Sequence, residues 1–162
     1  MIGHVDLTAI GGPEAEAWRE LLLLSETYPD SWCLVGAQMV TLHALAHGVS
    51  RPLRTIDVGI LVDVRVRSPR EISSFLLDRG FELDGVSRDG VGHRFVRGHI
   101  SIDVLSIDHA GERADRTTVP PAHTVAVPGG RQAIARLETM TLSIEGARET
   151  SSRRGAPAGF TR

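Results

Sequence analysis

The sequence predicts a mixed domain of the α/β or α+β class, in which a mixed β-sheet is flanked by helices. Segments with apolar residues at helical spacing alternate with short apolar segments as far as residue 79, and several short strand-like segments follow. The length of 162 residues fits one domain with its own core. A composition of 41% hydrophobic and 23% charged residues is typical of a globular protein.

The first three predicted elements are a helix, a strand and a helix. Apolar residues at helical spacing predict a helix over residues 14–26, and Pro13 suits its first turn. Residues 32–35 form a short apolar run before a glycine, which indicates a buried strand. The pattern over residues 38–47 predicts a second helix, which ends at Gly48.

The next two elements carry the strongest local signals. Branched apolar residues alternate with other residues over 55–64, which predicts a strand. Ser68 and Glu71 have the spacing of a capping box, and Pro69 suits the first helical position. The helix that begins there is expected to run to about Arg79.

The second half of the chain is predicted to be rich in short strands. We expect strands over residues 81–83, 93–96, 100–105, 124–127 and 140–144, with a short helix over 131–136. From residue 147 onward the chain is mostly Gly, Ala, Ser, Arg and Pro. The expected organisation is therefore one domain over residues 1–146 and a loose tail over 147–162.

The composition excludes several kinds of site. A net charge of −2 gives no strong signal for nucleic-acid binding. All 18 basic residues are Arg, so no Lys is present to act as a base or a phosphate ligand. Cys33 is the single cysteine, which excludes an internal disulfide. No apolar run approaches a membrane span and the N-terminus does not resemble a secretion signal, so the expected compartment is the cytoplasm and no membrane partner is expected.

Three segments carry candidate chemistry. Val35-Gly36-Ala37-Gln38 joins a strand to a helix through glycine, and the start of such a helix suits a phosphate group. Asp57 and Asp103 each lie among branched apolar residues on a predicted strand, where a carboxylate is costly to bury unless it is paired or binds a metal. The two acidic residues would meet if their strands were neighbours.

In this order and spacing, the segments from Trp32 to Ser106 resemble the nucleotidyltransferase superfold, in particular its minimal branch and the AbiEii-type toxin-like proteins. The resemblance implies a nucleotidyltransferase-like mixed sheet. It also implies that Asp57 and Asp103 are catalytic residues and Mg²⁺ ligands. The nucleoside triphosphate would lie near the positions Gly36, Ala37, Gln38, Arg54 and Thr55. In such sites, carboxylates on one face of a sheet hold two Mg²⁺ ions about 4 Å apart.

The sequence departs from the family pattern at the second carboxylate. That residue is expected two positions after Asp57, where the chain has Gly59. Asp63 lies on the same face of the strand but about 20 Å further along, so it cannot replace the missing ligand. Since ligand charge sets the affinity for hard cations, we expect weak Mg²⁺ binding, and an Asp introduced at position 59 should strengthen it.

A second departure lies near the C-terminus. Val127-Pro128-Gly129-Gly130-Arg131-Gln132-Ala133 resembles the segment that precedes the final helical region of the family, but the tail from Arg148 to Arg162 has no amphipathic helix to serve as that region. We expect either a truncated homologue or a change of reading frame near Ala147, and the sequence does not separate the two.

Three functions follow. The leading one is a degenerate nucleotidyltransferase-fold protein that binds a nucleotide or a cognate protein partner, as in a toxin–antitoxin pair, with little or no transfer. The alternative is an active Mg²⁺-dependent enzyme that moves a nucleoside monophosphate to a hydroxyl of an RNA, a protein or a small molecule. A structural or oligomerising remnant is the third.

Other residues have weaker signals. His43 and His47 have a spacing that suits zinc but are more consistent with a structural or surface role. Cys33 lies in a predicted buried strand and is expected to be inert.

Overall fold

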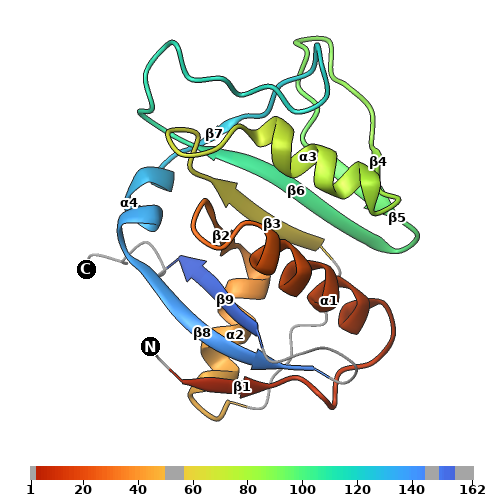
Figure 1. Ribbon diagram of the computed structural model, residues 1–162, viewed down its shortest axis with the longest axis vertical. Coiled ribbons are helices and arrows are strands. Elements are labelled where there is room, and N and C mark those ends of the chain that lie inside the picture. The colour runs from red at the N-terminus through yellow and green to blue at the C-terminus, as the bar shows by residue number, and fades with distance from the viewer. Residues whose placement is uncertain (1–2, 50–56, 145–149, 156–162) are drawn as a thin grey trace.

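The computed structural model describes residues 3–49, 57–144 and 150–155, which form the mixed α/β fold that the sequence predicts (Figure 1). Within these ranges the helices are α1 (Gly12–Thr27), α2 (Ala37–Ala46), α3 (Pro69–Asp78) and α4 (Gly130–Ala135). The strands are β1 (His4–Asp6), β2 (Trp32–Val35), β3 (Asp57–Val62), β4 (Glu82–Leu83), β5 (Arg94–Arg97), β6 (Ile100–Ile107), β7 (Ala126–Val127), β8 (Leu137–Ser143) and β9 (Thr150–Gly155).

The strands of the described part form one mixed sheet in the order β1-β8-β9-β2-β3-β6-β5-β4, and β7 pairs with the end of β6. β3 lies in the interior of the sheet, antiparallel to β2 and parallel to β6. Helices α1 and α3 lie in front of the sheet in Figure 1. The sheet therefore sets β2, β3 and β6 side by side, and these are the strands on which the candidate site was predicted.

The elements with strong end signals form where the sequence predicts them. The Ser68 hydroxyl accepts a hydrogen bond from the Arg70 backbone N–H, and the capping box with Glu71 is complete at the start of α3. Gly48 follows α2 with a φ of 74°, the left-handed conformation in which glycine commonly ends a helix. The predicted helix over residues 14–26 corresponds to α1, which begins two residues earlier.

The C-terminal segment differs most from the prediction. Part of the expected loose tail, Thr150–Gly155, forms β9, which is antiparallel to β8 and parallel to β2. The sheet thus extends past the expected domain end at residue 146. A strand is held by its backbone N–H and C=O groups, and a segment of Thr, Ser and Arg can pair without any apolar alternation to reveal it. Residues 147–149 and 156–162 of the expected tail lie outside the described residues.

Smaller differences concern other strands. β1 was not predicted, because a three-residue strand has too little pattern to distinguish it from a loop. β7 covers only Ala126–Val127 of the predicted 124–127. β8 starts at Leu137, three residues before the predicted segment, and ends at Ser143.

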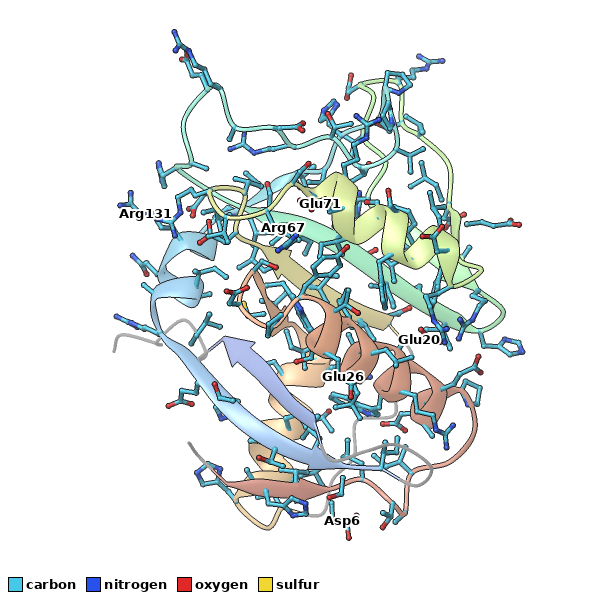
Figure 2. All side chains as sticks on the ribbon, viewed as in Figure 1. Asp6, Glu20, Glu26, Arg67, Glu71 and Arg131 are labelled. Carbon is cyan, nitrogen blue, oxygen red and sulfur yellow. The ribbon has the colours of Figure 1, made fainter. Side chains whose placement is uncertain are left out.

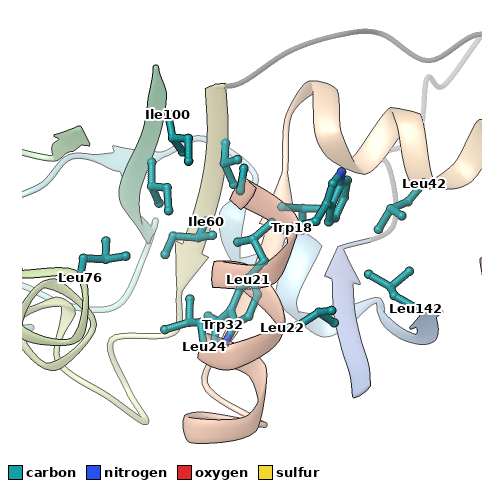
Figure 3. Packing of buried hydrophobic residues seen from close by; sticks show 14 of the residues in the cluster. Trp18, Leu21, Leu22, Leu24, Trp32, Leu42, Ile60, Leu76, Ile100 and Leu142 are labelled. Atoms are coloured by element: carbon teal, nitrogen blue, oxygen red, sulfur yellow. The ribbon is translucent and has the colours of Figure 1, made fainter. Parts of the chain in front are cut away.

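The main core lies between the helices and one face of the sheet (Figure 3). Trp18 and Leu21 of α1 pack with Ile60 of β3, Leu76 of α3 and Leu142 of β8, and each of these side chains is almost fully buried. These side chains come from helices and strands far apart in the sequence, so the core fixes the order of the central strands.

The opposite face of β3 and β6 has two parts. Near the strand ends, Leu61 and Ile107 are buried in a smaller cluster with residues of α4, such as Ile134. Near the strand starts, the same face has the polar residues Asp57 and Asp103, since alternate residues of a strand share a face. Among the described helices, none combines the length and apolar character that crossing a membrane requires.

Candidate functional site

Asp57 and Asp103 lie on the same face of neighbouring strands. In the parallel pairing of β3 with β6, Asp57 is opposite Ser101 and Gly59 is opposite Asp103. Paired residues of a ladder have their side chains on one face, and so do residues two apart on a strand. The two carboxylates are therefore diagonal neighbours, which is the juxtaposition that the sequence required for a shared site.

The glycine junction lies in the next strand. Val35, the last residue of β2, is opposite Gly59, and α2 begins directly after it. Gly36 has φ 76° and ψ −153°, a region that is essentially restricted to glycine. Gly36 and Ala37 are exposed, whereas Gln38 is buried. Arg54 and Thr55, the other predicted nucleotide-binding residues, lie outside the described residues.

Each carboxylate already has a partner in the protein. Asp57 Oδ1 accepts a hydrogen bond of 2.6 Å from the Ser101 hydroxyl. Asp103 accepts two hydrogen bonds from Arg94, one from Nε to Oδ1 at 2.8 Å and one from Nη2 to Oδ2 at 3.0 Å. A bidentate guanidinium pair of this kind has both charge and fixed geometry, so Asp103 is strongly engaged.

Arg94 is a site residue that sequence reasoning missed. It is directly opposite Asp103 in the antiparallel pairing of β5 with β6. Hydrogen bonds to Asp103 and its charge raise the pKa of the Arg94 guanidinium, and the charges of Asp57 and Asp84 add to the effect. The signal was present in the sequence: a two-residue hairpin at 98–99 pairs Arg97 with Ile100 and thereby sets residue 94 opposite residue 103.

The residues present do not fit a two-metal magnesium site. Position 59 has no carboxylate, and an ideal Cβ built on Gly59 would lie 3.1 Å from Val35 Cγ2 and 3.3 Å from the Val35 carbonyl oxygen. Asp103 is paired with Arg94 and Asp57 accepts a hydrogen bond from the Ser101 hydroxyl, so both predicted ligands already have partners within the protein. Across the described residues, no cluster of three or more His, Cys, Asp or Glu side chains has the arrangement of a metal site.

The remaining acidic candidate, Asp63, has a structural role. Its carboxylate receives two hydrogen bonds of 2.8 Å from the Arg65 guanidinium and one of 3.1 Å from the Arg65 backbone N–H. The hydrogen bond from the Arg65 side chain is the main cause that lowers the pKa of Asp63, and burial opposes it. Asp63 thus stabilises the turn between β3 and α3, which agrees with its exclusion from the site on grounds of distance.

The other residues that the sequence singled out have partners within the fold or are buried. The Arg67 guanidinium lies 2.8 Å from the Glu71 carboxylate, and both side chains are labelled at the start of α3 in Figure 2. Arg67 also stacks over the ring of Tyr28 at 4.4 Å. The His47 ring is hydrogen-bonded to the His43 backbone carbonyl at 2.8 Å. Cys33 is fully buried, as expected for an inert core cysteine.

Comparison with known proteins gives no relative for this chain. No family model, no curated protein and no solved structure matches it.

Proposed function

We propose that this protein is a degenerate nucleotidyltransferase-fold protein that binds a nucleoside triphosphate, or a cognate protein partner, with little or no nucleotidyl transfer. The observation that supports it is one row of paired residues across four strands: Val35, Gly59, Asp103 and Arg94. At one end of this row, Val35 is followed by Gly36 and α2; at the other end is the positively charged Arg94. Asp57 lies two residues before Gly59 on the same face.

Phosphate binding is proposed at the start of α2. The first backbone N–H groups of a helix have no partner within the helix, and the helix dipole favours an anion there. Gly36 and Ala37 are exposed, so this helix end is accessible. The bidentate pairing with Arg94 offsets the negative charge of Asp103, which would otherwise repel a triphosphate.

Loss of transfer is proposed from the ligand set. Nucleotidyl transfer in this superfold depends on metal ions that activate the acceptor hydroxyl and neutralise the phosphates. Gly59 provides no ligand, and the bond from Arg94 competes for Asp103. Mg²⁺ binding is therefore expected to be weak, and the pseudoenzyme is favoured over the active enzyme.

The test is thermal unfolding with ATP, CTP, GTP or UTP, each with and without Mg²⁺. A ligand that binds only the folded state raises the melting temperature, and the shift grows with the logarithm of the ligand concentration over Kd. We expect at least one nucleotide to raise it without Mg²⁺, and no labelled product in a transfer assay. Labelled product would support the active enzyme instead, and no response to any nucleotide would refute nucleotide binding.

A matched pair of variants locates the binding. Ala37→Glu adds a negative charge at the exposed first residue of α2, where it suits the helix dipole but repels phosphate. It should abolish the nucleotide-dependent shift while the melting temperature without ligand stays the same or rises. Ser74→Glu adds the same charge at an exposed position of α3 and should leave the shift intact. Equal loss in both variants would contradict binding at α2.

A further inference from the structure

Arg94 is surrounded by carboxylates. It forms the bidentate pair with Asp103, and the negative charges of Asp57 and Asp84 also act on its guanidinium. The Arg94 side chain is 46% exposed and that of Asp103 is 21% exposed, so the pair lies at the surface of the site and is accessible to solvent ions.

We infer that Arg94 is a built-in cation that takes the place of a metal ion at this acidic pair and excludes Mg²⁺ from it. The inference rests on the proposed function, because it concerns the same carboxylates and explains how a nucleotide would bind there without a metal. It goes further in assigning the exclusion to one side chain, so that removal of Arg94 should create a cation site that the native protein lacks.

The chemistry favours the guanidinium over the ion. Arg94 forms two hydrogen bonds of ordinary length to both Asp103 oxygens and stays charged at any physiological pH. Mg²⁺ gives up its water ligands reluctantly and needs near-octahedral geometry, usually with one or two carboxylates. Without a carboxylate at Gly59, only Asp57 and Asp103 remain as predicted ligands. The Arg94 guanidinium is covalently attached beside Asp103 and competes directly with an ion from solution for that carboxylate.

The test uses Mg²⁺ alone, titrated by calorimetry into wild-type protein and Arg94→Thr. Thr suits a strand, has no charge and leaves room for a hydrated ion. We expect no saturable binding by the wild type at millimolar Mg²⁺ and binding about tenfold or more tighter by Arg94→Thr. Adding Asp57→Asn to Arg94→Thr should remove the gain, since the new site needs both carboxylates.

The protein provides a matched control in Arg65→Thr. Arg65 is also 46% exposed and also forms a bidentate pair, with Asp63. Arg65→Thr leaves Asp63 without its guanidinium partner, but Asp63 lies outside the Asp57–Asp103 site. We therefore expect no gain in Mg²⁺ binding from this variant. Circular dichroism verifies folding of each variant, and Arg94→Lys, which keeps the positive charge, should still exclude Mg²⁺.

Three results would overturn the inference: tight Mg²⁺ binding by the wild type, no gain in folded Arg94→Thr, or an equal gain in Arg65→Thr. The first remains decisive even if Arg94→Thr does not fold. The calorimetric titration contains Mg²⁺ and no nucleotide, so its result is independent of whether the protein binds nucleotides. A protein that binds no nucleotide but gains Mg²⁺ binding on loss of Arg94 would refute nucleotide binding and leave this inference standing.

Discussion

At the scale of single residues, Gly59 limits how a further ligand can be added beside Asp57 and Asp103. A new Cβ there meets Val35 at 3.1 Å, closer than most real contacts, so the neighbouring side chain has to move by a few tenths of an ångström. Arg94 would still occupy Asp103. Gly59→Asp therefore adds a carboxylate that is crowded by Val35, while the charge of Asp103 is still neutralised by Arg94.

We predict that Gly59→Asp strengthens Mg²⁺ binding only modestly, whereas Gly59→Asp with Arg94→Thr strengthens it by more than the two single changes combined. Residues that share one site commonly show such coupling. Calorimetric titration of the four proteins, with a lower limit on Kd for the wild type, sets a bound on the coupling energy. Gly59→Ala isolates the steric effect, which we expect to reduce stability by about 1 kcal/mol. Additive effects in the cycle would show that Arg94 and position 59 act on separate sites.

The residue scale also shows how much of the site could be predicted. Gly36, Asp57 and Asp103 were identified because a glycine between strand and helix, and acidic residues among branched apolar ones, are local patterns. Arg94 and the crowding at Val35 depend on strand register, which joins residues far apart in the sequence. Sequence reasoning therefore located the acidic pair and missed both the arginine that pairs with Asp103 and the crowding beside Gly59.

At the scale of elements, Glu20 connects α1 to α3 and β5. Its buried carboxylate accepts hydrogen bonds of 2.9 and 3.0 Å from Arg79 and of 2.9 Å from Arg97. Figure 2 labels Glu20 on α1. Arg97 also donates to the Arg79 backbone carbonyl at the end of α3 and lies over the ring of Phe81. This network joins Glu20 of α1 to the C-terminal end of α3 and to β5.

The network has a predicted pH dependence. Burial raises the pKa of Glu20, but the hydrogen bonds from Arg79 and Arg97 outweigh it, so the pKa is lower than in the unfolded chain. A carboxyl of this kind stabilises the fold fully above its unfolded pKa of about 4.3, and this stability is lost as the pH falls through the folded pKa.

We therefore expect Glu20→Gln to lower the free energy of unfolding by about 2 kcal/mol at pH 7, since Arg79 is nearly half exposed and solvent weakens its pairing. The difference from wild type should shrink as the pH falls below about 4. Urea unfolding at a series of pH values measures it. Glu112→Gln, at an exposed loop position, is the control and should change little. A difference that stays constant with pH would contradict the assigned role of the Glu20 charge.

Helices and strands were predicted well where a short stretch of sequence has a clear capping or alternation pattern, and poorly where it has none. α3 begins where Ser68, Pro69 and Glu71 together specify a helix start, and β3 was predicted from its alternation. β9 is the opposite case, because Thr150–Gly155 pairs along both edges without an apolar pattern. Its place in the sheet depends on β8 and β2, so no window of local sequence contains the information.

At the scale of the whole molecule, the sheet separates two apolar clusters. Alternate residues of β2 face opposite sides: Trp32 belongs to the main cluster with Trp18, and Cys33 belongs to the smaller cluster beside α4. The exposed fractions of Trp18, Trp32 and Cys33 are 1%, 2% and 0%. The chain thus has a fluorescent reporter on one face of the sheet and a chemical reporter on the other.

We predict that both faces unfold in one transition. A sheet shared by the two clusters couples their opening, so that neither cluster can open without disrupting the strands that pack against the other. In a urea series, the red shift of tryptophan emission and the reactivity of the thiol toward a disulfide reagent in brief pulses should have the same midpoint. Cys33 is the single cysteine, so Cys33→Ala gives the background of the thiol assay. Thiol exposure at lower urea than the fluorescence change would show that the α4 face opens first, as a separate unit of lower stability.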